Sequence, residues 1–127
     1  MIVVAVTGLA IYGFLRQSGD EYTEREVALD SKEARAALAM FRQLAESTNH
    51  LAQFLSPKVS PIAKRMLHQR VRQLSESTEI TLKQAAWSGE YFRVEILGVT
   101  KTGSTDSHWF MLTEGEDGEL QLMGVQN

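Results

Sequence analysis

The sequence predicts an α+β fold in which N-terminal helices pack on a curved antiparallel sheet of about four strands. Apolar residues recur with a helical period from about residue 30 to 75, and with a period of two from about 79 to 126. Turn residues separate the alternating stretches at Ser88-Gly89, at 102–107 and at Asp117-Gly118. Because one face of such a meander must be covered, the two helices are expected to cover it.

The composition fits one folded domain. The chain has 127 residues, of which 43% are hydrophobic and 23% charged. The net charge of −3 argues against nucleic acid as a partner. The sequence contains no cysteine, which excludes disulfides, thiolate metal sites and a cysteine nucleophile.

Residues 2–15 carry no charge and precede Arg16. As a helix they would reach about 21 Å, against about 30 Å for a bilayer core. A cleaved signal peptide would need basic residues before the run and small residues at a cleavage site, and neither pattern is present. A buried strand starting at "IVVAV" is the third interpretation. The sequence favours an apolar helix over 1–16 that associates with a membrane, either partly inserted or lacking its first residues.

The residues after the apolar run indicate on which side of the membrane the rest of the chain lies. One arginine is followed by an acidic excess, whereas cytoplasmic flanks are rich in basic residues. We therefore expect residues 30–127 to form a domain outside the cytoplasm, joined to the membrane segment by a polar linker over 17–29.

The first helix is expected over about 30–55. Asp30 and Glu33 have the spacing of a capping box, in which Asp30 caps the helix. Apolar residues then follow at helical spacing, and the helix either runs unbroken or bends near 47–49. It must end before Pro57, because the residue before a proline avoids the α region.

The second helix is expected over about 60–75, with Ser60 as N-cap and Pro61 at the first position. One half of the helix is apolar, comprising Ile62, Ala63, Met66, Leu67, Val71 and Leu74. The other side carries a basic stripe, Lys64, Arg65, His68 and Arg72. Arg70 falls within the apolar half, where a guanidinium must reach the edge, pair with a carboxylate such as Glu95 or bind an anion.

The order of these elements resembles that of the nuclear transport factor 2-like (cystatin-like α+β) superfamily. The resemblance covers roughly 30–127 and is carried by Phe54-Leu55-Ser56-Pro57 between the helices and by the last strand, with Gly118, Leu120, Leu122 and Gly124. The tryptophan typical of that strand is absent; Gln121 and Leu122 stand there. The resemblance implies a cone-like fold that encloses a pocket. Its members include ketosteroid isomerase-like and polyketide cyclase-like enzymes, and non-catalytic domains tethered to bacterial inner membranes.

An enzyme of this kind would need a buried carboxylate base and an acidic hydrogen-bond donor. The sequence offers Glu95 and Asp106 as carboxylates and Tyr12 and Tyr91 as donors. The candidate ligand pocket consists of Arg70, Tyr91, Glu95 and Trp109. The alternative is that Glu95 has no role in binding or catalysis and lies, with Arg93, on a strand face exposed to solvent. The histidines His50, His68 and His108 share no metal-ligand spacing, so we expect no metal and no cofactor.

The sequence thus favours a non-catalytic, membrane-tethered binding or assembly module. The alternatives are a small pocket enzyme or small-molecule binder, and a soluble protein of unknown role whose first strand is residues 2–6. The expected contacts are a membrane through residues 2–15 and a protein partner or second copy through the sheet. The basic stripe is either a solvated helix face or a contact for anionic headgroups or an acidic partner.

Overall fold

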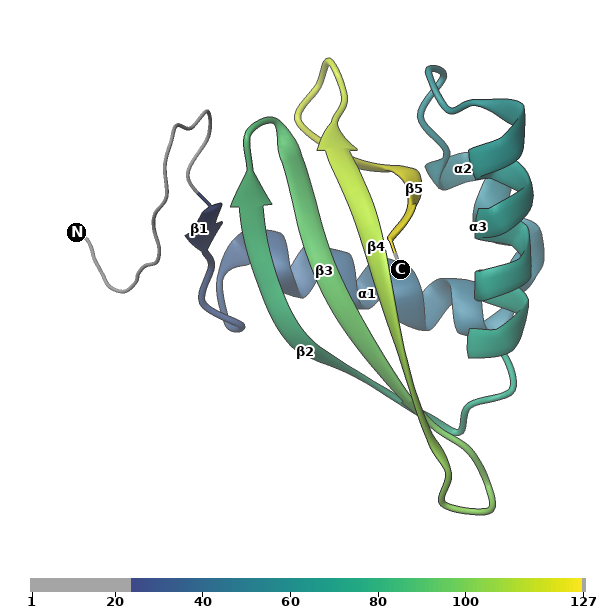
Figure 1. Ribbon diagram of the computed structural model, residues 1–127. Coiled ribbons are helices and arrows are strands. Elements are labelled where there is room, and N and C mark those ends of the chain that lie inside the picture. Colours follow the sequence, from purple (N-terminus) through teal and green to yellow (C-terminus); the bar gives the residue numbers. More distant parts are fainter. Residues whose placement is uncertain (1–23, 127) are drawn as a thin grey trace.

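A computed structural model describes residues 24–126 (Figure 1). The described part is α+β, with three α-helices and a five-stranded antiparallel sheet of order β1-β2-β3-β4-β5. The helices are α1 (Lys32–Glu46), α2 (Leu51–Phe54) and α3 (Pro61–Leu74), with a 3-10 turn at Thr48–His50 before α2. The strands are β1 (Glu24–Glu26), β2 (Glu79–Ser88), β3 (Tyr91–Val99), β4 (Thr105–Glu114) and β5 (Leu120–Gln126). The predicted α+β fold is confirmed at this level, and the apolar segment 1–16 lies outside the described residues.

The helices begin at serine caps. Ser31, rather than the predicted Asp30, is the N-cap of α1, and its hydroxyl accepts a hydrogen bond from the amide of Ala34. Ser60 caps α3 in the same way through the amide of Ala63, as predicted. The predicted first helix is interrupted at Ser47, whose extended backbone ends α1 before the 3-10 turn.

The sheet has one more strand than predicted. The predicted linker over 17–29 contains β1, a three-residue strand that pairs with the end of β2 through Glu24 and Ser88. Its polar sequence gave no alternation to signal a strand. Tight turns join the other strands, and Gly89 (φ 62°) and Gly118 (φ 84°) supply the left-handed backbone that two of these turns require.

The core lies between the helices and one face of the sheet (Figure 1). Its largest members, all with no exposed area, include Phe41 and Leu44 of α1, Phe92 of β3, and Phe110 and Leu112 of β4. The rings of Phe41 and Phe110 are 4.4 Å apart between centroids. We call the side of the sheet that faces the helices the covered face, and the opposite side the uncovered face.

The apolar stripe of α3 is narrower than predicted. Leu67, Val71 and Leu74 are buried in the core, whereas Ile62 is 65% exposed. Ala63, one residue later, packs near Gly124 of β5. Because successive helical residues are rotated by about 100°, Ile62 points away from the side that contacts the sheet.

Candidate functional site

The uncovered face gathers most of the candidate residues. Phe92, Val94 and Ile96 of β3 point into the core, so the residues between them point to the opposite side. The register places Trp109 beside Glu95 and Met111 beside Arg93. The uncovered face therefore carries a continuous group of side chains, which we call the sheet-face cluster: Tyr91, Arg93, Glu95, Trp109 and Met111.

Glu95 is held as a carboxylate within this cluster, with 7% of its surface exposed. One oxygen accepts a hydrogen bond from Nε2 of Gln84 at 2.8 Å, and the other accepts one from the hydroxyl of Ser107. Lys83 lies at a bulge in β2 and places Nζ 3.9 Å from the second oxygen. The Ser107 hydrogen bond lowers the pKa of Glu95, and it outweighs the opposing effect of burial.

Arg93 has a separate set of partners on the same face. Its guanidinium pairs with Glu24 of β1, donates to Oε1 of Gln126 at 2.8 Å and lies 4.9 Å from the ring centroid of Trp109. These contacts connect β1, β3, β4 and β5 across the sheet. Glu95 and Arg93 thus share a face as predicted, but each is satisfied by its own neighbours.

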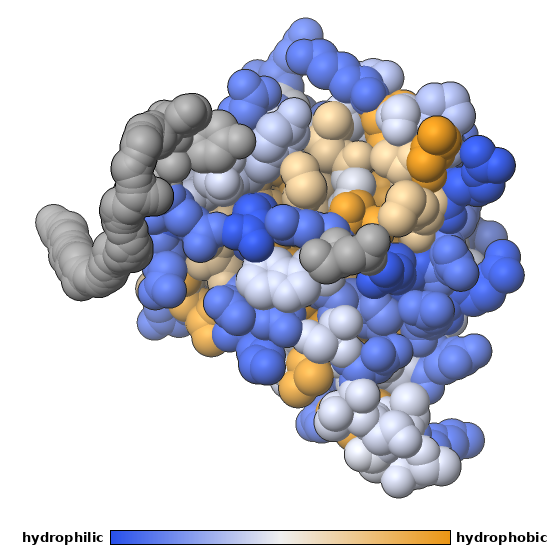
Figure 2. Space-filling model, viewed as in Figure 1, coloured by the Kyte–Doolittle hydropathy of each residue, from blue (hydrophilic) through white to orange (hydrophobic). Residues whose placement is uncertain are grey.

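Figure 2 looks onto the uncovered face. Apolar residues gather over the upper ends of β4 and β5, and hydrophilic residues frame them. Tyr91, Trp109, Met111 and Met123 are all partly buried rather than fully exposed. No helix of the described range covers this face.

Arg70 is not among the residues that contact Glu95, which are Gln84, Ser107 and Lys83. It acts electrostatically on His108, whose side chain belongs to the covered face of the sheet. The candidate pocket of Arg70, Tyr91, Glu95 and Trp109 is therefore divided by the sheet itself. Asp106 stands near the start of β4 with its side chain 62% exposed, and Tyr12 lies outside the described residues.

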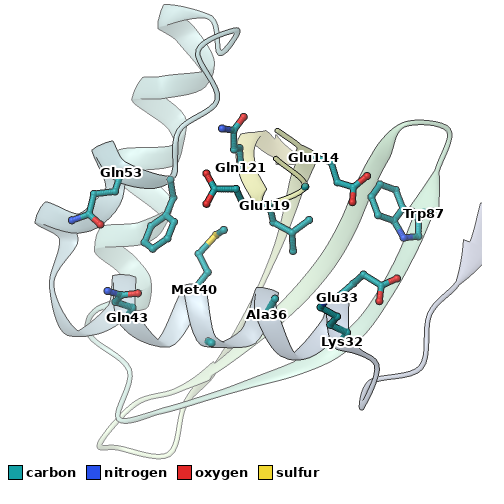
Figure 3. A pocket seen from close by; sticks show the side chains of 14 residues that line it. Lys32, Glu33, Ala36, Met40, Gln43, Gln53, Trp87, Glu114, Glu119 and Gln121 are labelled. Carbon is teal, nitrogen blue, oxygen red and sulfur yellow. The ribbon is translucent and has the colours of Figure 1, made fainter. Parts of the chain in front are cut away.

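A cleft that sequence reasoning missed lies between α1 and the β4–β5 end of the sheet. Its volume is about 720 Å³. Figure 3 shows Glu33, Glu114 and Trp87 at one end, Gln43 and Gln53 at the other. Its lining residues come from five elements (α1, α2, β2, β4 and β5) and the turn between β4 and β5, so no local sequence pattern signals the cleft. Arg70, Glu95 and Asp106 do not line it.

The basic stripe lies on the outer side of α3, and all four of its residues are exposed. Figure 1 places α3 and β1 at opposite ends of the sheet.

Two further observations concern metals and membranes. Within residues 24–126, no group of three His, Asp or Glu side chains is arranged to hold a metal ion. None of the helices in this range has the length and apolar character to span a bilayer, and the predicted membrane segment falls outside it.

Comparisons with protein-family models, curated proteins and solved structures find no match for this chain.

Proposed function

We propose that the protein is a non-catalytic assembly module, tethered to a membrane by residues 2–15, whose uncovered sheet face binds a second copy outside the cytoplasm. The observation that carries the proposal is the sheet-face cluster. It places Tyr91, Arg93, Trp109 and Met111 side by side on a face that no described helix covers. Aromatic residues, methionine and arginine are the residue types enriched in protein interfaces.

The cluster is already ordered before any partner arrives. Arg93 is fixed by Glu24, Gln126 and the Trp109 ring, and Glu95 is fixed by Gln84 and Ser107. Side chains that are fixed in advance lose less conformational entropy on binding. The face is therefore prepared for a rigid contact.

Its charge pattern fits a second copy. Arg93 and Glu95 are two residues apart on one strand, so the same row carries a positive and a negative group. In a twofold dimer, the same patch meets itself in reversed direction. The positive end of the row in one copy then lies opposite the negative end in the other, and the contact itself is made by the surfaces of Trp109 and Met111.

The apolar segment and the resemblance to the nuclear transport factor 2-like superfamily support the remainder of the proposal. Residues 2–15 carry no charge, and the acidic flank that follows favours a body outside the cytoplasm. The superfamily includes cone-like domains tethered to membranes, and the cleft beside α1 is consistent with a cone.

The test uses the full chain in two measurements. In cell fractionation, the chain is expected to pellet with membranes, to resist salt and to be released by detergent. In sedimentation of the detergent-solubilised chain, Met111→Asp is expected to give a monomer. Ile62→Asp is the matched control, because it places the same charge at an exposed apolar position on α3. A chain that is soluble without detergent, or monomeric before substitution, contradicts the proposal.

The cleft supports a second candidate function, the binding of a small molecule. Its walls combine apolar Met40, Phe54, Trp87 and Leu120 with carboxylates of Glu33 and Glu119. Seven of its fourteen lining residues are charged or amide residues, and the three carboxylates, of Glu33, Glu114 and Glu119, favour a ligand that carries a positive charge beside an apolar group. A change in tryptophan emission during titration with a library of small amphipathic amines would test this function; the change should disappear in Trp87→Phe, in which Trp109 still emits.

A further inference from the structure

His108 is a buried imidazole in an apolar setting on the covered face of β4. It is 3% exposed, pairs with Ile96 across the strands, and its ring centroid lies 6.3 Å from that of Phe110. Both ring nitrogens are buried, and neither makes a hydrogen bond within residues 24–126. Leaving buried polar atoms unpaired destabilises a fold, so the position of this ring needs an explanation other than packing.

Among residues 24–126, two charged groups act on the ring from different elements. On β4 itself, Oδ2 of Asp106 is 3.3 Å from Nε2 of His108, without the geometry of a hydrogen bond. From α3, Arg70 acts on the ring with its positive charge. β3 contributes the apolar Ile96 as the direct neighbour. Asp106 favours a protonated ring, whereas Arg70 disfavours it.

Burial outweighs both charges and lowers the pKa of His108 below its ordinary value of 6.5. We call the described structure, in which α3 packs on the sheet, the closed state; its His108 ring is therefore neutral near neutral pH. In an open state, in which the ring reaches water, the ring binds a proton more readily. As pH falls below about 6.5, proton uptake therefore shifts the equilibrium toward the open state.

We propose that His108 is an acid-sensitive latch between α3 and the sheet. In weak acid the ring takes up a proton and turns toward water, with Nε2 staying beside the carboxylate of Asp106, which lies 3.3 Å from it at the exposed start of β4. The protonated ring also repels Arg70, so the C-terminal half of α3, with Val71 and Leu74, separates from the covered face. This latch operates whether or not the uncovered face binds a second copy.

The test measures local opening of α3 in the full chain by amide hydrogen exchange, corrected for intrinsic rates. Between about pH 7.5 and 5, where histidines change charge, the opening constant of the Val71 and Leu74 amides should rise as pH falls. For a single proton the rise is at most about tenfold per pH unit. His108→Phe keeps a ring that cannot titrate, and its opening constant should not change with pH.

Matched variants separate the latch from general acid effects. His68→Phe, on the exposed side of α3, and His50→Phe, before α2, should retain the full pH dependence. Arg70→Met should weaken the dependence, because the closed state then accepts a proton more readily. An unchanged slope in His108→Phe, or a slope abolished by His50→Phe, overturns the proposal.

An NMR titration of the natural chain provides a second measurement that needs no core substitution. The His108 ring is expected to titrate below 6.5, together with shifts of the α3 amides. Titration of the ring at or above 6.5, or without any response from α3, overturns the proposal as well.

Discussion

The two faces of the sheet accommodate polar groups in opposite ways. On the uncovered face, Glu95 and Arg93 are partly or largely buried, yet each has several partners. On the covered face, His108 is more deeply enclosed, and within residues 24–126 its nitrogens make no hydrogen bond, although the carboxylate of Asp106 lies 3.3 Å from Nε2. The charged groups of the uncovered face thus have partners that stabilise them, whereas the buried imidazole of His108 on the covered face destabilises the packing around it.

The largest expected effect tests the covered face. Phe110→Ala removes a ring with no exposed area that packs against Phe41 at 4.4 Å. It should lower the free energy of unfolding by about 3–5 kcal/mol, as truncations of buried aromatic residues do. Urea denaturation measures this loss. A loss below that of Glu95→Gln would contradict the assignment of the core to this face.

Glu95→Gln tests the uncovered face and should cost about 1–3 kcal/mol, since it replaces hydrogen bonds to a charged group by weaker ones. Because its pKa is lowered in the fold, Glu95 stabilises the protein fully above the unfolded value of 4.5. That contribution is lost as pH falls through the folded pKa. Urea denaturation across this acid range should therefore show a weaker pH dependence in Glu95→Gln, and an equal dependence in both chains would contradict the carboxylate network.

The next largest loss in the free energy of unfolding is expected at the N-caps of α1 and α3. Ser31→Ala and Ser60→Ala each remove the hydroxyl that accepts from the third amide of its helix. Each should cost about 1 kcal/mol in urea denaturation. Asp30→Ala serves as the control and should cost less than Ser31→Ala, because Ser31 and not Asp30 is the cap. The reverse order would restore Asp30 as the cap.

The smallest effect is expected on the basic stripe. Lys64→Ala changes an exposed residue on the outer side of α3 and should alter the free energy of unfolding by less than about 0.5 kcal/mol. Urea denaturation checks this value too. A larger loss would mean that the stripe supports the packing of α3 rather than facing solvent.

Periodicity was enough to predict the α+β architecture, because the change from a helical period to alternation at about residue 79 reflects which side chains are buried. It also identified Ser60 as a cap and separated Tyr91 and Glu95 from the core-facing Phe92. It missed β1, since a three-residue polar edge strand has no pattern of its own. It also placed Arg70 with Glu95, because a helical wheel shows the face of a helix but not the side of the sheet on which that helix packs.

The cleft and the networks escaped prediction for a related reason. Arg93 meets Glu24, 69 residues earlier in the chain, and Gln126, 33 residues later. Such contacts depend on strand order, which the sequence expresses only through the packing of the whole domain. The bulge at Lys83, which brings its Nζ toward Glu95, is likewise set by pairing with β3.

The central claim is that the uncovered face binds a second copy of the chain at a membrane. Its most direct test places a photo-crosslinking amino acid at position 111, on that face, or at position 62, on α3, in the full chain within membranes. The claim predicts a covalent dimer of the chain from position 111 and little from position 62. Absence of a dimer from position 111, or equal yields from both positions, would contradict it.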